Sequence, residues 1–134
     1  TSRGRWYHTS WKGDIHKSGG VATNIGVHFF DMLIWIFGPV QESLVEIREN
    51  NKMTGRLELE NASVTWHLSV DGNELPPQAN GKSTWRYLEL DGEEFEFSDG
   101  FNDLHTAVYK DVLDGGGYGL DAARPAIELV HQLR

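Results

Sequence analysis

His28 is the side chain of this sequence with the clearest capacity for chemistry, and it lies within a strongly apolar stretch. An imidazole gains and loses protons near neutral pH, so a histidine beside a cleft can act as a general acid or base. Wound as a helix at about 100° per residue, the stretch places Gly20, Asn24, Asp31 and Trp35 on the same face as His28. Polar groups that are buried need partners. Either other protein groups satisfy this face, or it lines a cleft in which a substrate does.

A metal site is the rival interpretation of the histidines. His8, His16 and His28 could be gathered around an ion, because a neutral imidazole is a common metal ligand. No HExxH-type spacing and no second carboxylate accompany them, so we predict no metal. The sequence contains no cysteine, which excludes disulfides and thiolate-bound metals.

The apolar stretch predicts one long helix. Nearly every side chain from 27 to 37 is apolar, which indicates a helix that is buried on most sides. Gly38 suits a left-handed C-terminal cap, and Pro39 cannot continue the helix. Ser18 is a possible cap at the other end.

After this helix the apolar pattern changes to a period of two, which is typical of half-buried strands. The clearest strand covers 62–70, and a long loop rich in glycine and proline follows over 71–82. Asp91-Gly92 is the pair that a type I′ hairpin turn favours. Further strands are predicted at 42–49, 55–60, 83–90 and 94–97, and further helices over 103–113 and from 122, with Asp121 as the cap and Pro125 in the early turns. These elements predict an α+β fold with a single, mostly antiparallel, open-faced sheet and helices packed on one face.

Two regions outside these elements carry predictions as well. Residues 1–11 are predicted to be a strand or an extended arm, and 16–20 a loop. The uncovered sheet face would carry Trp85 and Tyr87 among polar groups. An aromatic face of this kind is a candidate subunit interface, so we expect a homo-oligomer that assembles through the open sheet face.

Composition and charge limit the class of protein. A chain of 134 residues suits one domain, and no apolar run is long enough for a membrane span. The net charge of −8 argues against nucleic-acid binding. Residues 1–17 nevertheless hold four basic residues against one acidic residue. This basic patch indicates either a localised anionic ligand or a solvated terminal strand. The chain begins inside patterned sequence, and we expect it to be a piece of a longer polypeptide.

Several motifs resemble one enzyme family. Residues 19–31, GGVATNIGVHFFD, are similar to the signature of the C-terminal domain of the Gfo/Idh/MocA oxidoreductases, the relatives of glucose–fructose oxidoreductase and inositol dehydrogenase. The resemblance covers essentially the whole chain and includes the closing segment 120–130, LDAARPAIELV. Within the family, SRGRWY at 2–7, SWKG at 10–13 and FNDLHT at 101–106 most resemble the bacterial UDP-sugar 3-dehydrogenases. Those enzymes oxidise UDP-N-acetylglucosamine or its uronic acid in surface-polysaccharide synthesis, including lipopolysaccharide.

The resemblance implies a divided enzyme. Residues 1–134 would be the C-terminal substrate-binding and oligomerisation domain, and the N-terminal dinucleotide-binding domain would be absent from this chain. That domain would bind NAD or NADP and supply a lysine in a Glu-Lys-Pro motif. The chain contains neither this motif nor a GxGxxG segment after a strand. It would therefore be inactive alone, and its partners would be a nucleotide sugar and its own dinucleotide domain, in the cytoplasm.

The resemblance also assigns roles to two of the residues on the helix face. The conserved histidine of the family matches His28, which would act as general acid or base or orient the reacting hydroxyl. Many relatives have aspartate where this chain has Asn24. An amide cannot ionise, although it donates and accepts hydrogen bonds. Asn24 would therefore position a sugar hydroxyl or the His28 ring, and more of the role of base would fall to the absent lysine.

The remaining site predictions concern the substrate. Basic side chains suit a diphosphate or a carboxylate, and aromatic side chains could cover a sugar or uracil face; both could equally belong to the packing of an edge strand. Thr23 could bind a sugar or bond back within the first helical turn, and Asp31 could hold the His28 ring or contact a neighbouring loop. Arg86 and Arg124 are weaker candidates. The predicted substrate-binding residues are Arg3, Arg5, Tyr7, Trp11, Lys12, Gly20 and Thr23.

Two other functions stay open on the sequence alone. The same family fold could act on a free sugar or a cyclitol such as inositol. The chain could also be a non-catalytic binding or assembly module that has kept the sheet and lost the chemistry.

Overall fold

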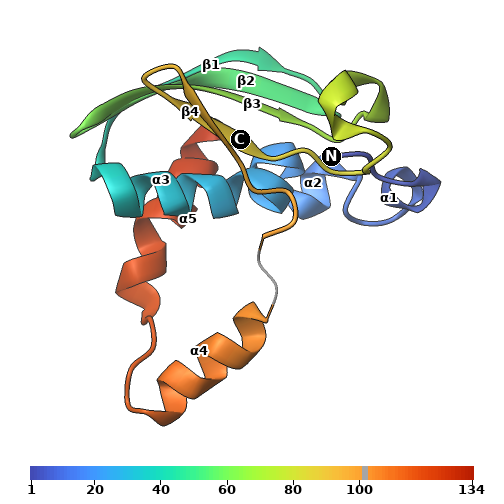
Figure 1. Cartoon of the computed structure of the whole chain (residues 1–134). Coiled ribbons are helices and arrows are strands. Elements are labelled where there is room, and N and C mark those ends of the chain that lie inside the picture. Colours follow the sequence, from blue (N-terminus) through green and yellow to red (C-terminus); the bar gives the residue numbers. More distant parts are fainter. Residues whose placement is uncertain (101–102) are drawn as a thin grey trace.

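Two antiparallel sheets and a layer of helices make up the computed structural model, which describes residues 1–100 and 103–134 (Figure 1). The larger sheet has the order β1-β2-β3, and the smaller one is the hairpin β4-β5. All pairings between these strands are antiparallel. The strands are β1 (Val40–Arg48), β2 (Lys52–Leu59), β3 (Ala62–Ser69), β4 (Tyr87–Leu90) and β5 (Glu93–Glu96).

The predicted α+β class is confirmed, but the described strands form two sheets instead of one. Residues at the N-terminus explain the division. The Arg3 N–H donates to the carbonyl of Val70, and the Ser2 N–H donates to the carbonyl of Ser83 at 2.6 Å. The N-terminal segment therefore lies beside the end of β3, between it and the stretch before β4. Because of this, the predicted strand over 83–90 shortens to β4.

The core lies between the larger sheet and the helix α3 (Val27–Phe37). Phe30 is fully buried, and its ring meets the Trp66 ring edge-on, with 5.3 Å between centroids. Gly26 allows this close approach, because a Cβ at that position would lie 2.7 Å from Leu68 Cδ1 on β3. The helix ends before Gly38, as predicted, but Gly38 has a φ of 89° and a ψ of −178°, so it adopts a positive φ without the left-handed helical conformation expected of the cap.

A π-helical turn, Ala22–Gly26, leads directly into α3. The Val27 N–H donates to the carbonyl of Ala22, five residues earlier, so this turn holds one residue more than an α-helical turn. Such bulges are rare and frequently mark functional sites. This one contains Asn24 and immediately precedes His28.

Short helices replace the strand or arm predicted over 1–11 and the loop predicted over 16–20. Helix α1 is Arg5–Thr9, and helix α2 is Ile15–Ser18. The Asp14 side chain caps α2 by accepting from the His16 N–H, and Gly19 ends it with a φ of 78°. Aromatic and threonine content favours strands. Here packing decides otherwise, because Tyr7 anchors α1 in the core.

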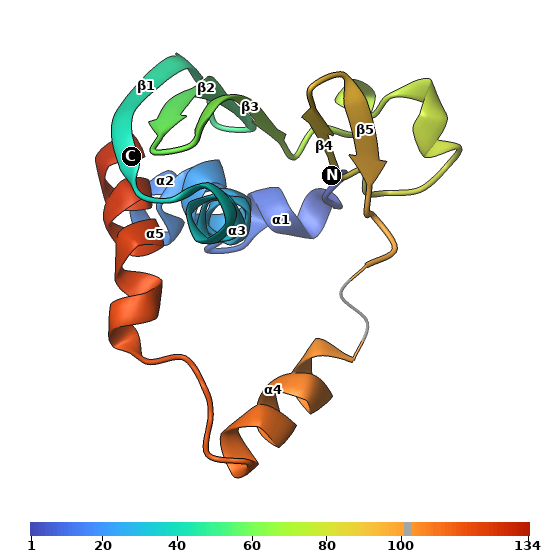
Figure 2. The ribbon, with the colours of Figure 1, turned by 60° about the vertical axis from the view of Figure 1, so that its left-hand side comes forward.

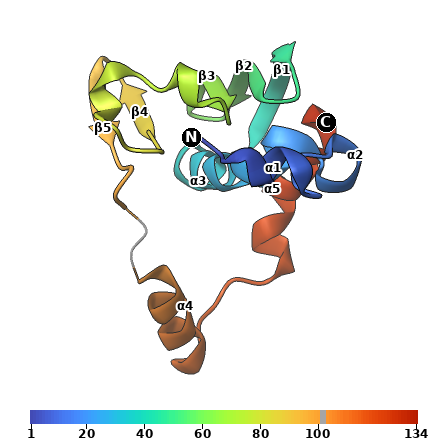
Figure 3. The same cartoon turned by 90° about the vertical axis from the view of Figure 1, so that its right-hand side faces the viewer.

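The C-terminal part of the described chain consists of α4 (Leu104–Leu113) and α5 (Leu120–Leu133). Helix α4 confirms the prediction over 103–113, whereas α5 begins before Asp121 and includes Pro125. Residues 101–102 of the predicted FNDLHT motif lie outside the described residues. Helices cover one face of the larger sheet, and α4 stands clear of them (Figures 1 and 3). No helix in the described ranges combines the length and the apolar character needed to cross a membrane.

Candidate active site

The exposed face of α3 carries the polar residues that the sequence places in line. His28, Asp31 and Trp35 are exposed at i, i+3 and i+7, whereas Phe30 and Leu33 are buried. Trp35 is 79% exposed. Among the described residues, no hydrogen bond to another side chain or to the backbone occupies the His28 ring. The ring is thus available to a ligand.

Asn24 is held in one orientation by two contacts with the N-terminal segment. Its Nδ2 atom donates to the Tyr7 hydroxyl at 3.3 Å and to the Lys12 carbonyl at 3.1 Å. A carbonyl oxygen only accepts, so the nitrogen of the amide must be the atom that faces Lys12. Both amide hydrogens are then used, and Oδ1 has no partner among the described residues. Asn24 therefore offers a fixed, uncharged acceptor.

Tyr7 is buried, whereas a residue that stacks on a sugar must expose its ring. Its side chain is 3% exposed, and its ring meets those of Trp6 and His8 edge-on, at 6.0 and 5.6 Å between centroids. The ring therefore presents no face to solvent. Its hydroxyl instead ties α1 to Asn24 on the π-helical turn.

Lys12 lies between two exposed tryptophans next to this network. Its Nζ atom is 5.9 Å from the centroid of Trp6 and 5.8 Å from that of Trp11. Aromatic faces attract a cation at this distance. Arg3 and Arg5 are exposed nearby in sequence, and none of the three cations has an ion-pair partner among the described residues. These three cations are thus free to bind an anion, whereas Lys17, the fourth basic residue of 1–17, lies 3.7 Å from a carboxylate oxygen of Asp14.

Sequence reasoning missed two of these features. Trp6 is not among the predicted substrate-binding residues, and its contact with Lys12 follows from helix α1, which the sequence pattern does not predict. The Lys12 carbonyl is a backbone group, so no residue type announces its contact with Asn24.

The other predicted residues of the site make local contacts. Gly20 is buried, with a φ of 76°, and its N–H donates to Ser18 Oγ at 3.0 Å. The Thr23 hydroxyl donates to the Gly19 carbonyl at 3.2 Å, which is the local bond considered as the alternative to sugar binding. Asp31 is exposed and makes no hydrogen bond to His28.

The weaker candidates and the metal alternative lie apart from this arrangement. Arg86 donates to the Ser98 carbonyl at 3.1 Å, and Arg124 lies 3.6 Å from a carboxylate oxygen of Asp121. Within residues 1–100 and 103–134, no group of three or more histidine or acidic side chains could hold a metal ion.

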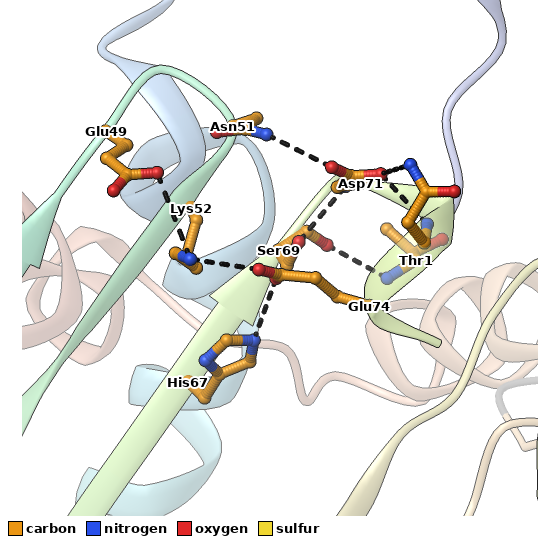
Figure 4. Close-up of polar contacts among 9 residues, drawn as sticks. Thr1, Glu49, Asn51, Lys52, His67, Ser69, Asp71 and Glu74 are labelled. Atoms are coloured by element: carbon orange, nitrogen blue, oxygen red, sulfur yellow. Dashed lines mark hydrogen bonds and ion pairs between the residues drawn. The ribbon is translucent and has the colours of Figure 1, made fainter. Parts of the chain in front are cut away.

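A second polar cluster fastens the loop after β3 to the outer face of the larger sheet (Figure 4). Glu74 accepts from Lys52 Nζ at 3.0 Å, and its other oxygen lies 3.3 Å from His67 Nε2. Hydrogen bonds from Ser69 and Lys52 hold the pKa of Glu74 below its usual value of 4.5. His67 faces away from the helix layer. The cluster of Lys52, His67 and Glu74 therefore attaches the loop to the sheet on the side opposite His28.

Comparison with known proteins agrees with this fold. The model of an oxidoreductase family, described as its C-terminal alpha/beta domain, matches residues 1–71. The chain therefore belongs to the Gfo/Idh/MocA oxidoreductase family. It is similar to the WlbA (WbpB) dehydrogenase from Thermus thermophilus in complex with NAD and UDP-GlcNAcA, with 50% identity and a TM-score of 0.92 over 99% of this chain.

A second structure of that Thermus thermophilus dehydrogenase gives a similar result. In its complex with NAD and alpha-ketoglutarate, it has 53% identity and a TM-score of 0.89 over 95% of this chain. The chain spans 43% and 42% of the lengths of these two solved chains.

Proposed function

We propose that this chain is the substrate-binding part of an NAD(P)-dependent dehydrogenase that oxidises a sugar hydroxyl. The substrate is a UDP-N-acetylhexosamine or its uronic acid, and the oxidised position is C3. The observation that carries the proposal is the accessible His28 beside the fixed acceptor of Asn24, in a chain half identical to a dehydrogenase solved with NAD and UDP-GlcNAcA.

Different residues of the chain bind the substrate and transfer the proton. His28 takes up or returns the proton of the hydroxyl, and Asn24 Oδ1 accepts a hydrogen bond from a neighbouring sugar hydroxyl. Lys12, Arg3 and Arg5 bind the negative charge of the diphosphate or the uronic acid. The exposed tryptophan faces beside Lys12 cover the sugar or the uracil ring.

NAD(P) does not fit the residues of this chain as its main binding site. A dinucleotide site uses parallel strands with a glycine-rich turn into a helix. The pairings between the described strands are antiparallel, and the glycines of 115–119 follow a helix. The hydride acceptor would therefore be bound by a separate dinucleotide-binding domain, and the isolated chain would be inactive.

The same proposal covers assembly and cellular context. Leu44 and Ile47 are exposed on β1, and Tyr87 is exposed on β4. These apolar groups on the sheets support a homo-oligomer formed through the open sheet face. The enzyme would work in the cytoplasm, where nucleotide sugars and NAD(P) are available, in surface-polysaccharide biosynthesis.

Substrate oxidation by the full-length protein tests the proposal. Reduction of NAD should be measured with UDP-N-acetylglucosamine, with its uronic acid, with the matching free sugars and with inositol. We expect reduction only with a UDP-linked sugar, and we expect UDP to compete with it. Oxidation of free sugars or inositol without competition by UDP would establish the other substrate class, and no oxidation of any of them would leave a binding module.

A further inference from the structure

Residues 104–125 form an arm that stands away from the rest of the described chain (Figures 1 to 3). No residue of α4 is buried, and the first two turns of α5, 120–125, are exposed as well. Burial begins at Ala126 and continues through the second half of α5. Contacts with the body continue after β5 through Phe97, whose ring lies 6.1 Å from that of Phe29, and Asp99, and the arm rejoins the body only at Ala126.

The arm exposes an unusual amount of apolar surface. Leu104, Val108 and Val112 lie at i, i+4 and i+8 on one side of α4 and are 48% to 52% exposed. A helix of this length is marginal in water without a partner. A contiguous exposed apolar surface marks an interaction site. Four further large apolar residues of the arm are 69% to 86% exposed: Tyr109, Leu113, Tyr118 and Leu120.

The arm has a defined internal geometry. The Asp111 carboxylate accepts from the Gly117 N–H at 2.8 Å, and the Asp111 carbonyl accepts from the Gly116 N–H at 2.9 Å. These bonds fix the turn between α4 and α5. The similarity to the first Thermus structure extends over 99% of this chain, so the match takes in the arm.

The position of the arm indicates what it contacts. Phe30 and Leu33 on α3 are buried toward the larger sheet, so the face with His28 looks away from that sheet. The arm extends on this same side of the helix layer (Figures 1 and 2). A domain that brings NAD(P) to a sugar held at His28 must occupy this side too. The solved chains are more than twice as long as this one and leave ample chain for such a domain.

We propose that the arm docks on the NAD(P)-binding domain of the same subunit through Leu104, Val108 and Val112, and so holds that domain over the face of His28. This inference rests on the proposed function. It leaves the sheet face, on the opposite side of the domain, for contacts between subunits.

Cross-linking of the full-length protein tests the docking without any substitution. Lys110 lies on the side of α4 opposite the apolar stripe, and an amine-reactive linker can join it to nearby lysines. Mixed subunits, with and without ¹⁵N, distinguish links within a subunit from links between subunits. We expect Lys110 to link to the NAD(P)-binding domain of its own subunit. Links only to a second subunit would overturn the proposal and identify the arm as an oligomer contact.

A substitution adds a functional readout. V108S/V112S in the full-length protein should raise the dissociation constant for NAD(P) at least about tenfold, with the oligomeric mass unchanged. T106A, on the opposite side of α4, is the matched control and should bind NAD(P) as the unaltered protein does. Unchanged NAD(P) affinity in V108S/V112S would refute the docking. Protein that shows the Lys110 links within a subunit but oxidises no UDP-sugar would refute the proposed function and leave the docking intact.

Discussion

Replacing Asn24 by aspartate should lower the free energy of unfolding of this protein. The amide nitrogen of Asn24 donates at 3.1 Å to the Lys12 carbonyl and at 3.3 Å to the Tyr7 hydroxyl. In N24D an oxygen faces the Lys12 carbonyl, so one hydrogen bond becomes a repulsive contact. The Tyr7 hydroxyl can rotate and donate to the carboxylate, so the second bond is kept in reversed direction.

The magnitude follows from the contact that is lost. A hydrogen bond contributes about 1 kcal/mol, and the contact with the Lys12 carbonyl is exposed, so water can replace the lost donor. N24D should therefore lower the free energy of unfolding by about 1 kcal/mol, or roughly 3–6 °C in Tm for a domain of this size. The neutral acid can donate to the Lys12 carbonyl, so this deficit should shrink at acid pH as the introduced carboxyl group is protonated.

Calorimetry of the full-length protein across acid and neutral pH measures both effects, and kcat and KM for the UDP-sugar should be measured alongside. N24A is the matched variant: it removes the same bonds without the repulsion and should be less destabilised than N24D at neutral pH. A Tm and kcat for N24D equal to those of the unaltered protein would refute the assigned orientation of Asn24.

Three further predictions concern binding, acid stability and packing. K12M should raise KM for the UDP-sugar about tenfold through loss of a charged contact, and should weaken its salt dependence; an equal effect in K17M, on α2, would contradict this role. Because the pKa of Glu74 is lowered in the folded protein, its contribution to stability is present above pH 4.5 and is lost as the pH falls through the lowered value. E74Q should therefore reduce the loss of unfolding free energy, measured in urea, as the pH falls below 4.5. The same loss in E74Q as in the unaltered protein would contradict a stabilising role of the Glu74 contacts. G26A should destabilise by about 1–3 kcal/mol, because the new Cβ meets Leu68 at 2.7 Å and this outweighs a helix-propensity gain of about 1 kcal/mol; a raised Tm would contradict the close packing.

Local patterns predicted much of the fold. The helix ending at Gly38 and the strand over 62–70 follow from apolar periodicity, and both are present. The turn at Asp91-Gly92 has positive φ at both residues, as a type I′ turn requires. Each of these features depends on residues that are close to it in the sequence.

Features that depend on distant contacts were not predicted. Helix α1 depends on burial of Tyr7, and the division into two sheets depends on hydrogen bonds from Ser2 and Arg3 to Ser83 and Val70. The cap of Asp14 on α2 was a local signal that could have indicated that helix.

In the candidate site, too, features that depend on local sequence were predicted and features that depend on distant contacts were not. That His28, Asp31 and Trp35 share one face follows from helical geometry. Their exposure does not, because the apolar stretch predicted a helix buried on most sides, whereas only Phe30 and Leu33 of α3 are buried and Trp35 and Ile36 are exposed. The orientation of Asn24 does not follow from it either, because its partners lie 12 and 17 residues away in the chain. The π-helical turn that carries it is also invisible to a calculation with a constant angle per residue.

The most direct measurement of the central claim is the turnover of the full-length protein with H28A. If His28 handles the substrate proton, kcat for oxidation of the UDP-sugar should fall by at least about 10²-fold, while Tm and UDP binding stay as they were. H131A, which removes an exposed histidine of α5, should turn over normally. Turnover by H28A close to that of the unaltered protein would contradict a role for His28 in proton transfer.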